Sequence, residues 1–307
     1  MSIEYPYRNY LFLYGASTKG EVINYVETQC VPEEKTLLQQ ILSDWAGASA
    51  TFRSIEETEK GEAEKIQVQE IPPEFYAEIK EVESDFLFKQ TFSLLPYDFK
   101  VVEIDRLVAC QRAVNLDYVD ILKNRVPANP TLSNLIKICL APPKQVKPPA
   151  EQVLAPNAYA FTSENLDFRF LGGFKKPLTQ DDILSCQAGG YPLAAIVLLM
   201  GLGSSAMNVL AYRNRFILNN GFHRAYALRS LGVTHIPVVI QRVTNPQIEM
   251  APVVANLPRE YLLGAARPAL MKDFLNPKII RQLKVKAWNK VVQVQWVVQQ
   301  FSIPIVG

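Results

Sequence analysis

Cysteine, histidine and long apolar runs are scarce in this chain of 307 residues. These shortages exclude several classes of site and of protein. The four cysteines are scattered along the sequence, at Cys30, Cys110, Cys139 and Cys186. Because no two of them have the spacing of a zinc-ligand pair, we expect reduced thiols and no metal site. No apolar run approaches the roughly 20 residues that a membrane-spanning helix needs. The run at 11–14 is also too short for a signal-peptide core, so we expect a cytoplasmic protein without a membrane partner.

Net charge is also small, since 32 Lys and Arg residues face 30 Asp and Glu residues. A formal charge of +2 gives no general argument for nucleic-acid binding. The distribution is less even: residues 54–85 hold eleven acidic and three basic side chains, and residues 257–290 hold eight basic and two acidic ones. We favour the interpretation that these regions screen each other within one molecule or across a dimer. An acidic face and a separate basic patch are the alternative.

The most informative stretch of the chain is Asn219–Gly232. Short apolar runs at 216–218 and 236–240 flank it, so the pattern predicts a strand, a glycine turn, a short helix and a second strand. Gly221 permits a positive φ angle and a close approach to the backbone. The first turn of the helix that follows leaves N–H groups free to bind an anion.

Four residues at this turn are candidates for a phosphate site: Asn220, Gly221, His223 and Arg224. A side-chain cation in the first turn of a helix is unfavourable for the helix dipole. That cost is understandable if a phosphate or carboxylate occupies the site. In the structural alternative, His223 caps the helix and Arg224 pairs with a surface carboxylate.

The string NNGFHRAYALRSLGVTHIPVVI (219–240) resembles the Gly-x-His-Arg segment of the ParB/sulfiredoxin superfamily. Val101–Gln111 is similar to the opening strand and Leu-Val-x-x-Gln turn of that superfamily, and Asp117–Leu122 is similar to the helix that follows. The resemblance implies a mixed-sheet α+β core with a nucleotide or phosphate site. Members include partition proteins that bind CTP, sulfiredoxin, a serine kinase that uses ADP, and ParB-like nucleases.

Two departures limit what the resemblance implies. Sulfiredoxin carries a cysteine between the glycine and the histidine, whereas this chain has Phe222, so thiolate chemistry is excluded at that position. Partition proteins continue into a helix-turn-helix, and no such pattern follows residue 243.

The remaining candidate site residues lie in or directly after the segment Val101–Gln111. Glu103 and Asp105 come at the end of a predicted strand, where a carboxylate can act as a general base or hold Mg²⁺ near phosphates. A solvent-facing pair of carboxylates is the alternative. Gln111 and Arg112 match the turn that approaches the phosphate in relatives, and Arg112 could clamp a phosphate with two hydrogen bonds. Arg112 could equally be a surface charge.

We predict an α+β protein with three parts. Residues 1–95 form a helical N-terminal extension, residues 96–243 form the ParB/sulfiredoxin-like core with an insertion at about 140–190, and residues 244–307 form a β-rich C-terminal addition.

Local patterns add five finer expectations. Ser17 or Thr18 caps a first helix, and the acidic tract after Arg53 is a solvated surface or a loose loop. The proline-rich residues 141–156 have no regular structure. The apolar runs 194–200 and 207–212 form a strand pair across a Gly/Ser turn, and alternation across 292–298 predicts a last strand.

The leading hypothesis for function is binding of a nucleotide, with or without Mg²⁺, or of another phosphate ligand. Phosphoryl transfer or phosphodiester cleavage would extend it, but the sequence supplies no complete catalytic set. One alternative is a DNA-associated regulatory module that uses the basic residues of 267–290. Another is a non-catalytic interaction scaffold, and a homo-oligomer is compatible with either.

Overall fold

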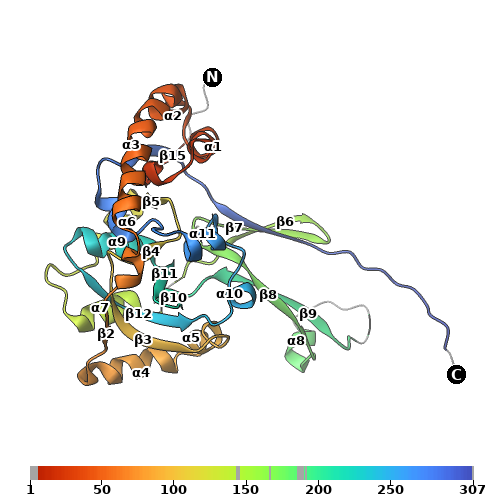
Figure 1. Cartoon of the computed structure of the whole chain (residues 1–307). Helices are drawn as coiled ribbons and strands as arrows, with labels where there is room; N and C mark the ends of the chain where they lie inside the picture. The colour runs from red at the N-terminus through yellow and green to blue at the C-terminus, as the bar shows by residue number, and fades with distance from the viewer. Residues whose placement is uncertain (1–5, 143–145, 166, 185–189, 191, 306–307) are drawn as a thin grey trace. The chain divides into compact units, whose positions relative to one another are not determined.

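The computed structural model describes residues 6–142, 146–165, 167–184, 190 and 192–305, so Cys186 lies outside the described residues. The chain divides into two compact units. The first comprises residues up to 143 together with 204–287, and the second comprises 144–203 together with 288–307. Helices and mixed sheets are both present, which confirms the predicted α+β class (Figure 1).

A six-stranded mixed sheet forms the centre of the first unit, in the order β2-β3-β12-β10-β11-β4. Its strands are β2 (Val68–Glu70), β3 (Tyr97–Glu103), β4 (Val108–Ala109), β10 (Asn208–Tyr212), β11 (Arg215–Asn220) and β12 (His235–Arg242). β12 runs parallel to β10, and β11 runs parallel to β4, while the other neighbours are antiparallel. β12 is buried over six consecutive residues, as expected of a strand covered on both faces.

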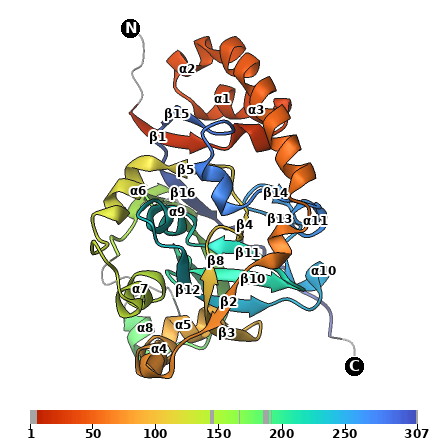
Figure 2. The ribbon, with the colours of Figure 1, turned by 60° about the vertical axis from the view of Figure 1, so that its left-hand side comes forward.

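A second sheet of the first unit joins three distant parts of the chain, in the order β15-β1-β5. Its strands are β1 (Tyr7–Phe12), β5 (Ala113–Asn115) and β15 (Arg281–Lys286). α1 (Lys19–Gln29) and α3 (Leu38–Thr58) pack here, with Val22, Val26 and Ile41 in one buried cluster with Phe12 and Leu283 (Figure 2). Thr18 caps α1 in a reciprocal capping box with Glu21, which confirms one of the two predicted caps.

The remaining elements of the first unit are short. The α-helices are α2 (Pro32–Thr36), α4 (Tyr76–Ser84), α5 (Phe86–Thr91), α6 (Leu116–Lys123), α7 (Leu132–Cys139), α9 (Phe222–Ser230), α10 (Pro246–Glu249) and α11 (Arg259–Gly264). The 3-10 helices are η1 (Tyr14–Ala16), η2 (Glu62–Lys65), η3 (Pro73–Phe75) and η4 (Met271–Leu275), and a small hairpin contains β13 (Val253–Val254) and β14 (Leu257–Pro258). In the part of the chain that is described, no helix has the length and apolar character that crossing a membrane requires.

The second unit contains two small antiparallel sheets. One has the order β16-β7-β6, with β6 (Ala150–Ala155), β7 (Ala158–Ser163) and β16 (Lys290–Gln295). The other pairs β8 (Phe168–Lys176) with β9 (Ala195–Leu202). The helix α8 (Gln180–Leu184) follows β8 along the chain.

The bounds of the two units differ from the bounds of the three predicted parts. Residues up to 95 share one unit with the central sheet, because β1 pairs with β5 and β15 and β2 pairs with β3. The predicted insertion at about 140–190 extends to 203 as part of the second unit. The predicted C-terminal addition is divided between the units, since β15 belongs to the first and β16 to the second.

Several local expectations were wrong. The runs at 194–200 and 207–212 are strands, but β9 pairs with β8 while β10 pairs with β11 and β12. Residues 150–155 form β6 despite the neighbouring prolines, because β7 supplies a pairing partner. The last strand ends at Gln295, before the end of the alternating pattern.

The acidic tract after Arg53 starts as helix rather than as a loose loop, since α3 continues to Thr58, and the exposed Glu57 agrees with the alternative of a solvated surface. Glu59 pairs with Arg267 and with Lys272, each at 2.8 Å. The acidic and basic regions therefore screen each other within one molecule, as predicted.

Candidate functional site

The two sequence segments that resemble the superfamily meet where two parallel strands end. β4 and β11 pair through Val108 with Ile217 and Ala109 with Leu218. Residues 110–112 therefore leave the sheet beside Asn220 and Gly221, since parallel strands end at the same edge. The Cys110 thiol donates to the Leu218 carbonyl at 2.8 Å, which fixes the two segments together.

Gly221 makes the turn into α9 with φ at 97°, the left-handed conformation that glycine adopts without strain. A Cβ atom at this position would overlap the buried Met207 side chain, so close packing also requires glycine. Gly221 has no side chain to cap the helix. The N–H groups of Phe222, His223 and Arg224 find no acceptor among the residues that the structure describes. The predicted glycine turn and helix N-terminus are confirmed.

His223 lies in this uncapped first turn. Its ring makes an edge contact with Tyr118 of α6, with ring centroids 5.5 Å apart. α6 and α9 lie side by side in both views of the ribbon (Figure 1, Figure 2). The Nε2 atom of His223 is buried and has no hydrogen-bond partner within the described residues. Burial lowers the pKa of His223 to about 4, so the imidazole is neutral at pH 7.

Arg224 has the contacts of a structural residue. Its Nη1 donates to the carbonyls of Ile138 at 3.1 Å and Cys139 at 3.3 Å, and Nη2 donates to the Ser205 carbonyl. The cation therefore satisfies carbonyl groups at the end of α7, where the helix dipole favours positive charge. These contacts support neither a phosphate clamp nor the alternative pairing with a surface carboxylate.

Asn220 also stabilises the loop before β10. Its Nδ2 donates to the Ala206 carbonyl at 3.1 Å and to the Ser204 carbonyl. Together with Arg224, it holds residues 204–206 against the start of α9. We therefore assign Asn220 to shaping the turn rather than to contacting a ligand.

Gln111 and Arg112 lie on the loop after β4. The Gln111 side chain is half-buried and makes no hydrogen bond within the described ranges of the chain. The Arg112 guanidinium lies 5.0 Å from the ring centroid of Tyr261, a cation–π contact. Its Nε and Nη1 atoms are buried without a partner in the described structure. Arg112 is therefore not an ordinary surface charge, and its two nitrogen atoms remain able to donate to an anion.

The predicted catalytic carboxylates do not join this site. Asp105 pairs with Arg229 at 2.6 Å, and Arg229 is in the last turn of α9. Arg229 and His223 are six residues apart on one helix, about 9 Å along its axis. Glu103 pairs with Arg106 at 2.7 Å and accepts from the Gln67 N–H at 3.3 Å. Both carboxylates thus have ion-pair partners away from the first turn of α9.

Metal binding has no support in the described part of the chain, where no group of three or more His, Cys, Asp or Glu side chains is placed to hold an ion.

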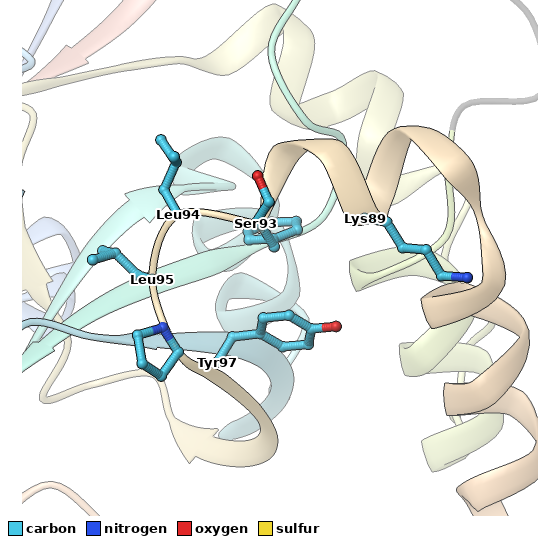
Figure 3. A pocket seen from close by; sticks show the side chains of 7 residues that line it. Lys89, Ser93, Leu94, Leu95 and Tyr97 are labelled. Atoms are coloured by element: carbon cyan, nitrogen blue, oxygen red, sulfur yellow. The ribbon is translucent and has the colours of Figure 1, made fainter.

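Two hollows of the first unit lie elsewhere. The larger, about 570 Å³, is a shallow depression between the end of α5 and the start of β3 (Figure 3). Its lining residues are Lys89, Phe92, Ser93, Leu94, Leu95, Pro96 and Tyr97. The other, about 350 Å³, surrounds the β10–β11 turn at Arg213. None of the residues predicted for the site lines either hollow, so neither supports the phosphate hypothesis.

Tyr118 contacts His223, but the sequence patterns did not predict Tyr118 as a residue of the site. Its position could have been anticipated, because Asp117–Leu122 was already matched to the helix that follows the first segment. The contact itself could not be predicted, because α6 follows β5 of the three-stranded sheet and α9 follows β11 of the six-stranded sheet.

No family model, curated protein or solved structure matches this chain. The ParB/sulfiredoxin resemblance therefore stays a prediction.

Proposed function

We propose that this protein binds a phosphate-containing anion, with nucleotides as the expected class, at the first turn of α9. The observation that carries the proposal is that backbone and side-chain groups at this turn lack hydrogen-bond partners together. Three backbone N–H groups have no acceptor in the described structure, and the buried Nε2 of His223 has none either. A buried polar atom without a partner, such as Nε2, is costly, and an anion would satisfy it together with the N–H groups.

The geometry suggests how each part would contribute. Gly221 would contribute through its positive φ angle, which turns the chain so that the first N–H groups of α9 can face a ligand. A neutral imidazole still carries one N–H, so His223 can donate from Nε2 in that tautomer. The Gln111 amide, on the loop after the neighbouring parallel strand, is a further donor in this region.

Arg224 and Asn220 would position this turn without touching the ligand, since their donors are engaged with carbonyl groups. The proposal is consistent with the resemblance to the ParB/sulfiredoxin superfamily, in which a Gly-x-His-Arg turn serves a nucleotide or phosphate site.

The proposal is a binding function and includes no reaction. Glu103 and Asp105 hold ion pairs with Arg106 and Arg229, so neither is placed as a base for a ligand at α9. DNA binding has less support, because Arg267 is buried and Arg281 pairs with Asp44 at 2.6 Å. Much of the basic tract is thus used within the molecule.

Replacing His223 with phenylalanine should weaken phosphate binding by about 10- to 100-fold, the effect of one hydrogen bond to a charged group. Phenylalanine keeps a ring against Tyr118 and removes Nε2. Isothermal titration calorimetry would measure binding of pyrophosphate, ATP, ADP, CTP and GTP, with and without magnesium.

The matched control is His235→Phe. His235 also has a buried Nε2 atom without a partner in the described residues, but it lies at the start of β12. This variant should bind as the wild type does. Equal affinities for wild type and His223→Phe, or no binding across the whole panel, would refute the proposal.

A further inference from the structure

β9 of the second unit is an unprotected edge strand. Its sequence, Ala-Ile-Val-Leu-Leu-Met-Gly-Leu, contains no charged residue and no proline, the devices that normally block edge pairing. Within the described structure it pairs only with β8, so its other edge is open (Figure 1). None of its eight residues is buried, and Ile196 is 82% exposed.

The second unit also has little core of its own. Among its described residues, the buried apolar ones are Ala158, Ala160 and Phe168. Large apolar side chains are exposed on several of its segments, including Phe170 on β8, Leu199 on β9 and Phe301 after β16. Exposed apolar surface of this extent marks an interaction surface. A partner that covers β9 would supply burial that the unit lacks.

We propose that this partner is a second copy of the chain, with β9 pairing antiparallel to β9 of the other copy across a two-fold axis. Such an interface is self-complementary, because the same strand faces itself. In such a pair, a charged residue at the two-fold axis would lie opposite its own copy. β9 has no charge, so self-pairing has no electrostatic cost.

The pairing geometry restricts the register. A two-fold axis perpendicular to the sheet keeps each side chain on its own face, so a residue at the axis lies opposite itself. For central pairing this places Leu198 opposite Leu198, or Leu199 opposite Leu199. The result is a four-stranded sheet with two copies of β8 at its edges. A lipid surface fits less well, because the open backbone groups of β9 would have no hydrogen-bond partner in hydrocarbon.

Light scattering during size-exclusion chromatography of the full chain tests the proposal. The wild type should be a dimer at micromolar concentration. Leu198→Lys should raise the dimer dissociation constant at least about 100-fold, because it places two desolvated like charges close together. Leu94→Lys is the matched control, since Leu94 belongs to the first unit and is 89% exposed. It makes the same chemical change and should leave the dimer intact.

A cross-linking experiment does not depend on how well the lysine variant folds. Opposite Cβ atoms of an antiparallel pair are roughly 4.5–5.5 Å apart, within the range that a disulfide can close with small adjustment. Under mild oxidation, Leu198→Cys or Leu199→Cys should form a covalent dimer that reductant reverses, whereas Leu94→Cys should not. A monomeric wild type, a Leu198→Lys variant that dimerises as the wild type does, or no cross-link at either position would overturn the proposal.

Discussion

Replacing Asp273 with alanine is expected to lower the free energy of unfolding by about 3–5 kcal/mol, the usual result of removing one partner of a buried ion pair. The Arg267 side chain is fully buried, and Asp273 is 4% exposed. Asp273 accepts from Arg267 Nη2 at 2.7 Å and from the Leu270 N–H at 2.8 Å. Alanine would leave the Leu270 N–H without its acceptor, and Glu59 would be the one carboxylate still paired with the buried cation. Urea denaturation measures the loss.

The control for this variant is Asp120→Ala. Asp120 is 71% exposed and pairs with Lys123 at 3.4 Å, so its loss should change stability by no more than about 0.5 kcal/mol. Similar stability losses for the two variants would contradict the account of a buried ion pair between Arg267 and Asp273.

Arg224→Ala should destabilise the fold by about 2–4 kcal/mol, because three carbonyl groups lose a charged donor. At the end of α7, the Ile138 carbonyl would lose this donor, whereas the Cys139 carbonyl would keep the Met207 N–H at 2.7 Å. Thermal and urea denaturation of the ligand-free protein measure the effect.

Arg125→Ala is the matched control, since Arg125 is an exposed arginine of the same unit. It should be nearly neutral. If Arg224 instead served only to bind phosphate, its removal would leave the ligand-free protein as stable as the wild type. That outcome would restore Arg224 as a ligand contact.

Local sequence signals predicted the turn at Gly221 well. The apolar runs, the glycine and the helical segment after it lie within about 25 residues, and each specifies its own conformation. β11, α9 and β12 therefore follow the predicted pattern. The same holds for the Thr18 cap, which depends on two residues three positions apart.

Side-chain and strand partners that are distant in the sequence could not be predicted in the same way. The roles of Arg224 and Asp105 depend on residues far away in sequence, the end of α7 and Arg229 respectively. β9 and β10 each have strong strand patterns, but nothing in either pattern specifies which neighbour it pairs with. Their placement in different units follows from pairing with β8 in one case and with β11 and β12 in the other.

The pKa of the His223 imidazole, measured with and without ligand, tests the proposed site most directly. The chain has only two histidines, so proton NMR of the wild type and of His235→Phe assigns both imidazoles. In the ligand-free protein the pKa of His223 should be about 4, because burial disfavours the charged ring.

A phosphate beside Nε2 favours the protonated ring, so saturating ligand should raise the pKa of His223 by one unit or more. Pyrophosphate and the tightest-binding nucleotide of the calorimetric panel are the probes, titrated with the protein over a range of pH. The account predicts this rise for His223. A pKa for His223 that stays the same in the presence of saturating ligand would contradict binding at the first turn of α9.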